Sequence, residues 1–160
     1  MSERVEAALR DYADMVYKIA LSQTKNKDDA EDIFQNVFLS LVRNKKEIAT
    51  DEHMKAWLIR VTVNHCKKLF RAAERQRTTE LTEDMAIFTP AEQDVLTEVL
   101  ELPPLYRTAI HLFYYEDMTV DGIAAALEVK PATVKSRLHR GREMLREKLK
   151  GEYGFDEQHL

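Results

Sequence analysis

One stretch of the chain places a tryptophan among basic and amide side chains at the spacing of a helix face. Residues 53–73 read HMKAWLIRVTVNHCKKLFRAA. At 100° per residue one arc is apolar, and the opposite arc carries Trp57, Arg60, Asn64, Lys67 and Lys68. An indole offers a stacking plane for an unpaired base, and the cations beside it neutralise phosphates. The pattern is typical of a single-strand nucleic-acid surface; the alternative is a tryptophan packed on a neighbouring helix among solvated charges.

A second basic stretch has the pattern of a helix-turn-helix. Residues 119–142 read TVDGIAAALEVKPATVKSRLHRGR, a short helix, a tight turn and a longer helix opening at Pro131. The outer face of the longer helix combines small, polar and basic residues that suit the major groove. Base edges are assigned to Thr133, Ser136, His139 and Arg140, and phosphates to Lys130, Lys135 and Arg137. The alternative is an amphipathic surface helix without a ligand.

Catalytic and metal-binding patterns do not accompany these stretches. The five histidines show neither HExxH nor Cys/His ligand spacing, and the sequence has no Walker loop and no GxGxxG. Cys66, the single cysteine, excludes an internal disulfide and fits a reducing compartment. We therefore expect a protein that is not an enzyme and that binds no metal and no cofactor.

The charge distribution separates the two basic stretches from the rest of the chain. Residues 53–77 carry seven basic and one acidic side chains, and residues 129–150 carry eight and two. Between them, residues 78–128 carry one basic and eleven acidic side chains. Acidic surroundings repel a phosphate backbone, so nucleic acid is expected only at the two basic stretches.

Helical periodicity runs through most of the chain, and no useful length of strand-like alternation interrupts it. With only 4 Gly and 4 Pro, this favours an all-α fold. The prediction is two small helical domains, one of three helices and one of four with the helix-turn-helix, joined by a flexible linker. The domains span 1–73 and 90–150, the linker 74–89 and a mobile tail 151–160.

The cellular location follows from what the sequence lacks. No stretch approaches 18 uncharged apolar residues, so no membrane insertion is expected. The first residues, MSERVEAALRDYADM, carry acids early and have no apolar core of a signal peptide. A cytoplasmic protein is therefore expected.

Two blocks of the sequence, in order, resemble the extracytoplasmic-function (ECF) group of the sigma-70 family of bacterial RNA polymerase sigma factors. The first runs from YADMVYKIALSQTKNKDDAEDIFQNVFLSLVR through AWLIRVTVNHCKK and is similar to sigma region 2. The second runs from VLELPPLYRTAIHLFYYEDMTVDGIAAALEV through KPATVKSRLHRGREML and is similar to region 4. The resemblance covers roughly residues 8–150, without a region 3 between the blocks.

For the first block the resemblance implies two binding surfaces. The helix matching DAEDIFQNVFLSL binds the clamp helices of the largest polymerase subunit in the family. Its polar face here carries Asp28, Asp32, Gln35 and Asn36, and it also carries Leu39, an apolar residue that suggests a protein partner. Asn36 stands where the family usually has glutamate. The helix matching AWLIRVTVNHCKK reads and melts the minus-ten element. The resemblance thus assigns Arg60, Asn64, Lys67 and Lys68 to the non-template strand and Trp57 to the melted edge. The loop of about residues 44–53 corresponds to the segment that holds a flipped base.

For the second block the resemblance implies recognition of the minus-thirty-five element. Lys135, Ser136, His139 and Arg140 stand at the matching positions, and Arg107 matches a position near the DNA backbone. The implied partners are core RNA polymerase, promoter DNA and an anti-sigma factor.

Two other functions fit part of the sequence. A helix-turn-helix regulator that binds DNA without polymerase explains residues 119–142, but it leaves the first basic helix and Leu39 unexplained. An interaction protein that keeps the fold without promoter activity is the third possibility.

Overall fold

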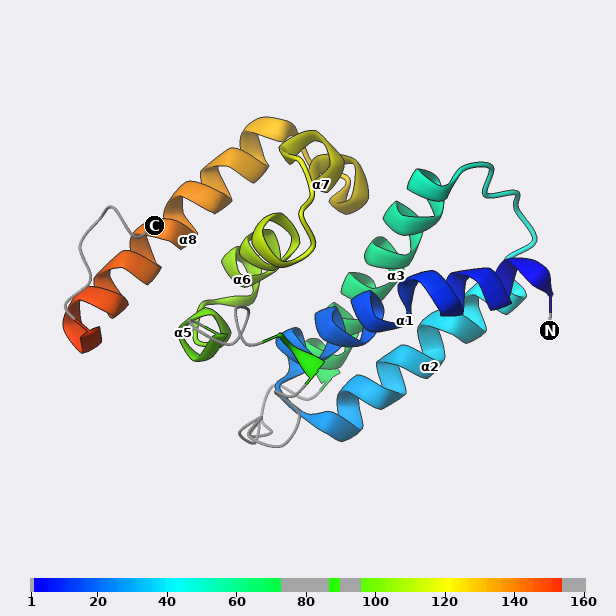
Figure 1. The fold of residues 1–160 in the computed structure, drawn as a ribbon, viewed down its shortest axis with the longest axis horizontal. Helices are drawn as coiled ribbons and strands as arrows, with labels where there is room; N and C mark the ends of the chain where they lie inside the picture. The colour runs from blue at the N-terminus through cyan, green and yellow to red at the C-terminus, as the bar shows by residue number, and fades with distance from the viewer. Residues whose placement is uncertain (1, 73–86, 90–95, 154–160) are drawn as a thin grey trace. The chain divides into compact units, whose positions relative to one another are not determined.

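The computed structural model describes residues 2–72, 87–89 and 96–153, and most of these residues lie in helices (Figure 1). No strand occurs among the described residues, which confirms the all-α prediction. The chain forms two compact units, divided between Ile87 and Phe88. Most of the predicted linker and of the predicted tail lies outside the described residues. Of the helices described, none has the length and apolar character needed to cross a membrane.

The first unit is a bundle in which each of three helices contacts the other two. Each helix begins at a side-chain oxygen that accepts a hydrogen bond from a first-turn amide, which satisfies a donor that the helix itself leaves unpaired. The capping residues are Ser2, Asn26 and Thr50. The helices are α1 (Glu3–Thr24), α2 (Lys27–Arg43) and α3 (Asp51–Ala72).

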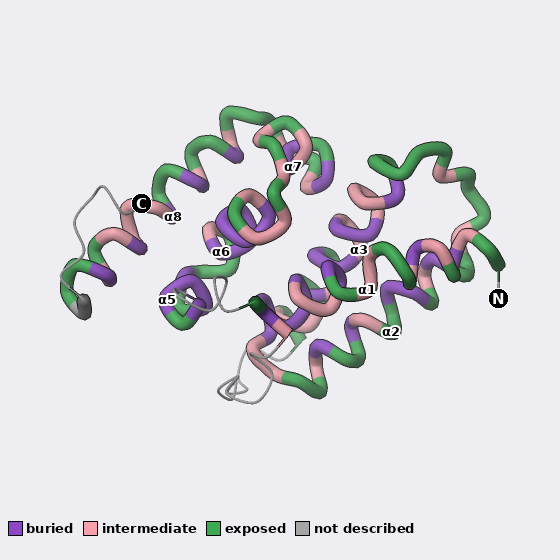
Figure 2. Tube along the Cα trace, in the orientation of Figure 1, coloured by how far each residue is buried: buried purple, intermediate pink, exposed green. Residues whose placement is uncertain are grey.

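Apolar side chains along one side of each of these helices form the core of the first unit (Figure 2). Burying such side chains stabilises a fold by about 1.5–3 kcal/mol each, before the cost of ordering the chain. The fully or nearly fully buried members include Val16, Ile19, Val37, Leu41, Leu58 and Ile59. The polar faces of α2 and α3 are consequently left outside.

The second unit contains the predicted helix-turn-helix and the helices that support it. Its elements are α5 (Leu96–Leu100), α6 (Pro104–Ile110), η2 (His111–Tyr115), α7 (Val120–Leu127) and α8 (Pro131–Tyr153). The longest of these, α8, contacts α5, α6 and α7. It ends three residues beyond the predicted position of about 150.

The helical segment over residues 104–115 changes its hydrogen bonding at His111. A π-helical turn replaces the α-helix there, and the Glu116 N–H donates to the His111 carbonyl at 3.2 Å. The buried imidazole of His111 also hydrogen-bonds the Glu116 carboxylate, with Nε2 and Oε2 3.1 Å apart. This polar pair, in which the imidazole is buried and the carboxylate partly exposed, lies where the regular helix ends, and apolar periodicity does not reveal it.

Phe88 belongs to the second unit, although the sequence pattern placed it in the linker. Its side chain is 1% exposed, and its ring lies edge-to-face with His111 and Tyr115 at centroid distances of 6.4 and 6.1 Å. Aromatic pairs of this geometry stabilise a core beyond the area they bury. A lone phenylalanine in a polar stretch has no periodic neighbours from which its burial could be predicted.

Candidate nucleic-acid and polymerase interfaces

The basic face of α3 opens to solvent along the second half of the helix. Asn64, Lys67 and Lys68 are exposed, whereas Trp57 and Arg60 are half-buried nearer the start. The opposite side of the helix is buried in the core of the unit. The predicted division into an apolar and a basic arc is therefore confirmed, while the assignment of the basic arc to DNA stays a prediction.

Lysine and arginine supply the charge on this face. His65 lies in the same part of α3, and burial together with the positive charge of Lys68 lowers the pKa of its imidazole. His65 is therefore neutral at pH 7 and adds no charge. The indole of Trp57 is partly covered by protein and partly open, as a stacking platform requires.

The geometry of α7 and α8 is that of a helix-turn-helix. Thr119 caps the start of α7 with its side-chain oxygen, and Glu128 ends the helix with a left-handed φ of 59°. Ala124 and Ala126 are buried and small, which lets α8 approach α7 closely, whereas Ala125 is exposed. The inner face of α8 is apolar and buried, and it consists of Val134, Leu138, Gly141, Leu145 and Leu149.

The outer face of α8 carries the predicted DNA-reading residues. Lys130, Lys135, Ser136, His139 and Arg140 are exposed, and Thr133 and Arg137 are half-buried. Glu143 lies one turn further along this helix. Its carboxylate is 3.6 Å from the Arg140 guanidinium and 3.8 Å from the His139 imidazole. Both contacts are solvent-exposed and therefore weak, so a phosphate can displace them.

The placement of Arg107 contradicts its predicted contact with the DNA backbone. Its side chain is 3% exposed, and Nη1 donates to the Leu100 carbonyl at 2.7 Å. This bond ties the end of α5 to α6 inside the second unit. A guanidinium used in this way cannot reach a phosphate unless the unit opens. Arg107 is thus a structural residue and is removed from the candidate DNA-binding set.

The predicted polymerase-binding face of α2 is exposed along its length. All five of its residues lie outside the core: Asp28, Asp32, Gln35, Asn36 and Leu39. The side chain of Leu39 is 46% exposed, and Val42, one turn later, is 57% exposed. Sequence reasoning missed Val42 because a valine near a helix end is as easily buried as exposed. Neighbouring exposed apolar side chains are a feature of protein interfaces.

The start of α2 concentrates negative charge beside this face. Burial, and then the carboxylates of Asp32 and Asp28, raise the pKa of Asp29. The carboxylates also lie near the positive end of the α2 dipole, which favours them. The face therefore combines acids at one end with apolar side chains at the other.

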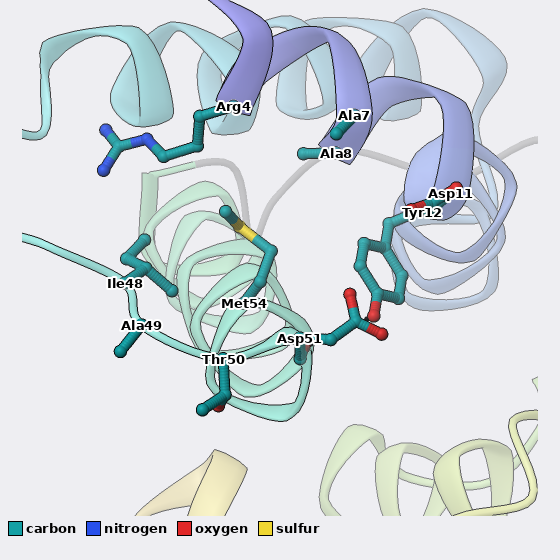
Figure 3. Close-up of a pocket in the computed structure, with 10 residues that line it drawn as sticks. All are labelled: Arg4, Ala7, Ala8, Asp11, Tyr12, Ile48, Ala49, Thr50, Asp51 and Met54. Atoms are coloured by element: carbon teal, nitrogen blue, oxygen red, sulfur yellow. Dashed lines mark hydrogen bonds between the residues drawn. The ribbon is translucent and has the colours of Figure 1, made fainter.

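A pocket of about 210 Å³ opens in the first unit between α1 and the start of α3 (Figure 3). Part of its lining is the loop that joins α2 to α3, which by resemblance corresponds to the segment that holds a flipped base. It also includes side chains of α1 that no sequence pattern indicated. The lining residues are Arg4, Ala7, Ala8, Asp11, Tyr12, Ile48, Ala49, Thr50, Asp51 and Met54.

Comparison with known proteins identifies both halves of the chain. Residues 8–76 match the family description Sigma-70 region 2, and residues 92–145 match Sigma-70, region 4. The ECF RNA polymerase sigma factor SigE of Mycolicibacterium smegmatis is 34% identical over 155 residues, which cover 88% of this chain and 60% of that protein. The ECF RNA polymerase sigma factor SigM of Bacillus subtilis is 31% identical over 149 residues, covering 84% of this chain and 88% of SigM.

Two solved structures share the fold. The sigma factor RpoE from Bartonella quintana, solved with the anti-sigma factor NepR, gives a TM-score of 0.72 at 24% identity. The match covers 94% of this chain and 99% of RpoE. CnrH, solved with the cytosolic domain of CnrY, gives a TM-score of 0.71 at 19% identity. This match covers 94% of this chain and 91% of CnrH.

These matches establish the class of protein that the two helical units define. The chain belongs to the ECF group of the sigma-70 family of RNA polymerase sigma factors. Proteins of this family are transcription initiation factors and not enzymes, in agreement with the function expected from the sequence.

Proposed function

We propose that this chain binds core RNA polymerase and directs it to promoters, with one unit reading the minus-ten element and the other the minus-thirty-five element. The observation that carries the proposal is that each unit presents one basic helix face to solvent in an otherwise acidic chain. DNA is repelled elsewhere, so both faces must act for stable promoter binding. Because polymerase and promoters share the bacterial cytoplasm, we expect the protein to act there.

In the first unit, α3 would bind the non-template strand of the melted minus-ten element. Lys67 and Lys68 are exposed and would neutralise phosphates. Asn64, one helical turn earlier and also exposed, would offer its side-chain amide to a base. Trp57 would stack at the edge of the melted region, with Arg60 beside it. Stacking on the indole is open only to an unpaired base, so it favours the open strand over the duplex, which is how binding energy would promote melting.

In the second unit, α8 would enter the major groove at the minus-thirty-five element. Its first turns expose Ser136, His139 and Arg140 toward base edges, with Thr133 at the border of the core. Lys130, Lys135 and Arg137 would hold the flanking phosphates. DNA would displace the weak, exposed contacts of Glu143 with Arg140 and His139.

The exposed face of α2 would bind the polymerase. Asp28 and Asp32 would pair with basic residues of the partner, and Gln35 and Asn36 would supply hydrogen bonds. Leu39 would be buried on binding, and Val42 extends the same apolar end. This surface is distinct from α3 and α8, so polymerase and DNA can be bound together.

An anti-sigma factor is a further proposed partner. The structures of RpoE and CnrH both contain a second protein, which for RpoE is named as an anti-sigma factor. A regulator of this kind would block polymerase binding, DNA binding or both. The alternative, a helix-turn-helix regulator independent of polymerase, is not favoured, because it leaves the match to sigma region 2 unused.

The test is co-elution of the full chain with sigma-free bacterial core polymerase on size exclusion. The wild type should co-elute, and a variant with Asp32, Gln35 and Leu39 all replaced by alanine should not. The control is Lys67→Ala/Lys68→Ala, which alters the DNA face of α3 and should co-elute like the wild type. Absence of wild-type co-elution at micromolar concentration would overturn the proposal and favour the independent regulator.

A further inference from the structure

The loop over residues 44–50 has little structure of its own. Its internal hydrogen bonds come from Asn44, whose side chain accepts from the Lys46 N–H at 3.3 Å and donates to the Lys46 carbonyl at 3.5 Å. Ile48 is half-buried, while Ala49 and Thr50 are exposed. Burial of apolar side chains therefore contributes little to the loop's position, so other contacts must hold it.

Arg4 of α1 provides such a contact at the start of the loop. Its guanidinium donates to three main-chain carbonyls, those of Leu41 at 3.1 Å, Asn44 at 2.5 Å and Lys46 at 2.9 Å. The first of these belongs to the last turn of α2 and also accepts from the N–H of Asn44, the residue that ends the helix, at 3.2 Å. Hydrogen bonds from a charged donor are stronger than neutral ones, and a planar fork holds several acceptors at once.

Tyr12, two turns further along α1, provides the matching contact at the end of the loop. Its hydroxyl donates to the main-chain carbonyl of Asp51 at 3.3 Å, where α3 begins. Ala8 lies between Arg4 and Tyr12 on the same stripe and is 2% exposed. Its small side chain leaves room between the two contacts, and the pocket of Figure 3 occupies this region.

We propose that Arg4 and Tyr12 are positioning residues that clamp the loop from both ends, so that it is held ready to select an unpaired promoter base. The proposal rests on the proposed function, in which α3 binds the melted minus-ten element, and on the resemblance, by which the loop before α3 corresponds to the segment that holds a flipped base. A loop ordered before binding loses less conformational entropy when it captures a base. Removal of the clamp should therefore weaken base selection more than it weakens assembly with polymerase.

The clamp is tested first without polymerase or DNA. Backbone order parameters of residues 45–50 are measured by NMR relaxation in the full chain, for the wild type, Tyr12→Phe and Arg4→Ala/Tyr12→Phe. Tyr12→Phe keeps the ring and removes only the hydroxyl, so it stays informative if the double variant folds poorly. We expect the order parameters to fall from about 0.85 to below about 0.6 in the double variant. Arg10→Ala is the control, because Arg10 is exposed on the same helix and its guanidinium lies 3.4 Å from the carboxylate of its neighbour Asp11. Unchanged loop order in both variants would overturn the clamp.

Base selection is tested second, with polymerase assembled on each variant. Binding is compared for single-stranded minus-ten oligonucleotides that differ at one position. The wild type should prefer its best base by about tenfold or more, which corresponds to one good base contact. The double variant should lose most of this preference while co-eluting with polymerase as the wild type does. Full preference in a variant with a disordered loop would overturn the role in selection. Failure of the wild type to co-elute would instead overturn the proposed function, with the clamp still judged by loop order.

Discussion

Replacing Gly141 with alanine should destabilise the second unit, although glycine is normally the weaker residue in a helix. A Cβ at this position would lie 2.9 Å from Ile110 Cγ1, closer than real Cβ atoms pack, and 3.2 Å from Ile110 Cδ1, which is also a tight contact. Ile110 is 2% exposed, and as a β-branched residue within a helix it has essentially one rotamer available. The new methyl group must therefore push α8 away from α6.

The magnitude follows from two opposing terms. Alanine gains about 1 kcal/mol of helix propensity over glycine. Forcing an extra methyl group into a packed core costs about 1–3 kcal/mol. Because Ile110 cannot rotate away, we expect the upper part of that range and a net loss of about 1–2 kcal/mol. For a unit of this size, each kcal/mol lowers the melting temperature by roughly 4–8 °C.

The assay separates the two units by their signals. Trp57 is the single tryptophan and lies in the first unit, so its fluorescence reports that unit alone, whereas far-ultraviolet circular dichroism reports both. Gly141→Ala should move the dichroism transition and leave the fluorescence transition in place. Gly151→Ala is the matched control in α8, because a Cβ there meets nothing within 4 Å. If Gly141→Ala proved as stable as Gly151→Ala, the argument from the α6–α8 contact would be wrong.

Three further changes test other parts of the molecule. Lys67→Ala/Lys68→Ala should reduce the salt dependence of single-strand binding by about 1.4 in log–log slope, since each phosphate contact contributes about 0.7; an unchanged slope would place the phosphate contacts elsewhere. Arg107→Ala should lower the melting temperature of the second unit and leave the salt slope unchanged, because it removes a buried bond and no phosphate contact. Burial, and then the hydrogen bond and negative charge of the Asp51 side chain, raise the pKa of Tyr12 to about 12. The folding stability that the neutral hydroxyl contributes below pH 10 is therefore lost as the pH rises toward 12. Tyr12→Phe should remove this loss in alkaline unfolding experiments, and an identical pH profile would count against the contact.

The sequence predicted best those features that repeat along a helix. Val134, Leu138 and Leu145 recur on one face of α8, and all three are buried. The same arithmetic placed Asn64 and Lys67 outside the core of the first unit, where the structure has them. Periodicity works here because burying an apolar stripe is the main source of stability for a small helical unit.

Features that depend on single long-range contacts could not be predicted in this way. Arg4 reads as an ordinary solvated charge, yet its acceptors lie 37 to 42 positions away in the sequence. In the sequence, Arg107 is the lone cation of an acidic stretch, yet in the structure its guanidinium donates a hydrogen bond to the buried carbonyl of Leu100. Main-chain carbonyls are present at every residue, so no residue pattern marks those that need a donor.

The separate cores of the two units have a consequence for genetics. A substitution such as Gly141→Ala damages the second unit and leaves the α2 surface of the first unit folded. Under the proposed function, such a variant would still occupy polymerase and withhold it from the wild-type protein in the same cell. Alleles that damage the second unit are therefore expected to be dominant. Alleles that unfold the first unit are expected to be recessive, because their products cannot compete for polymerase.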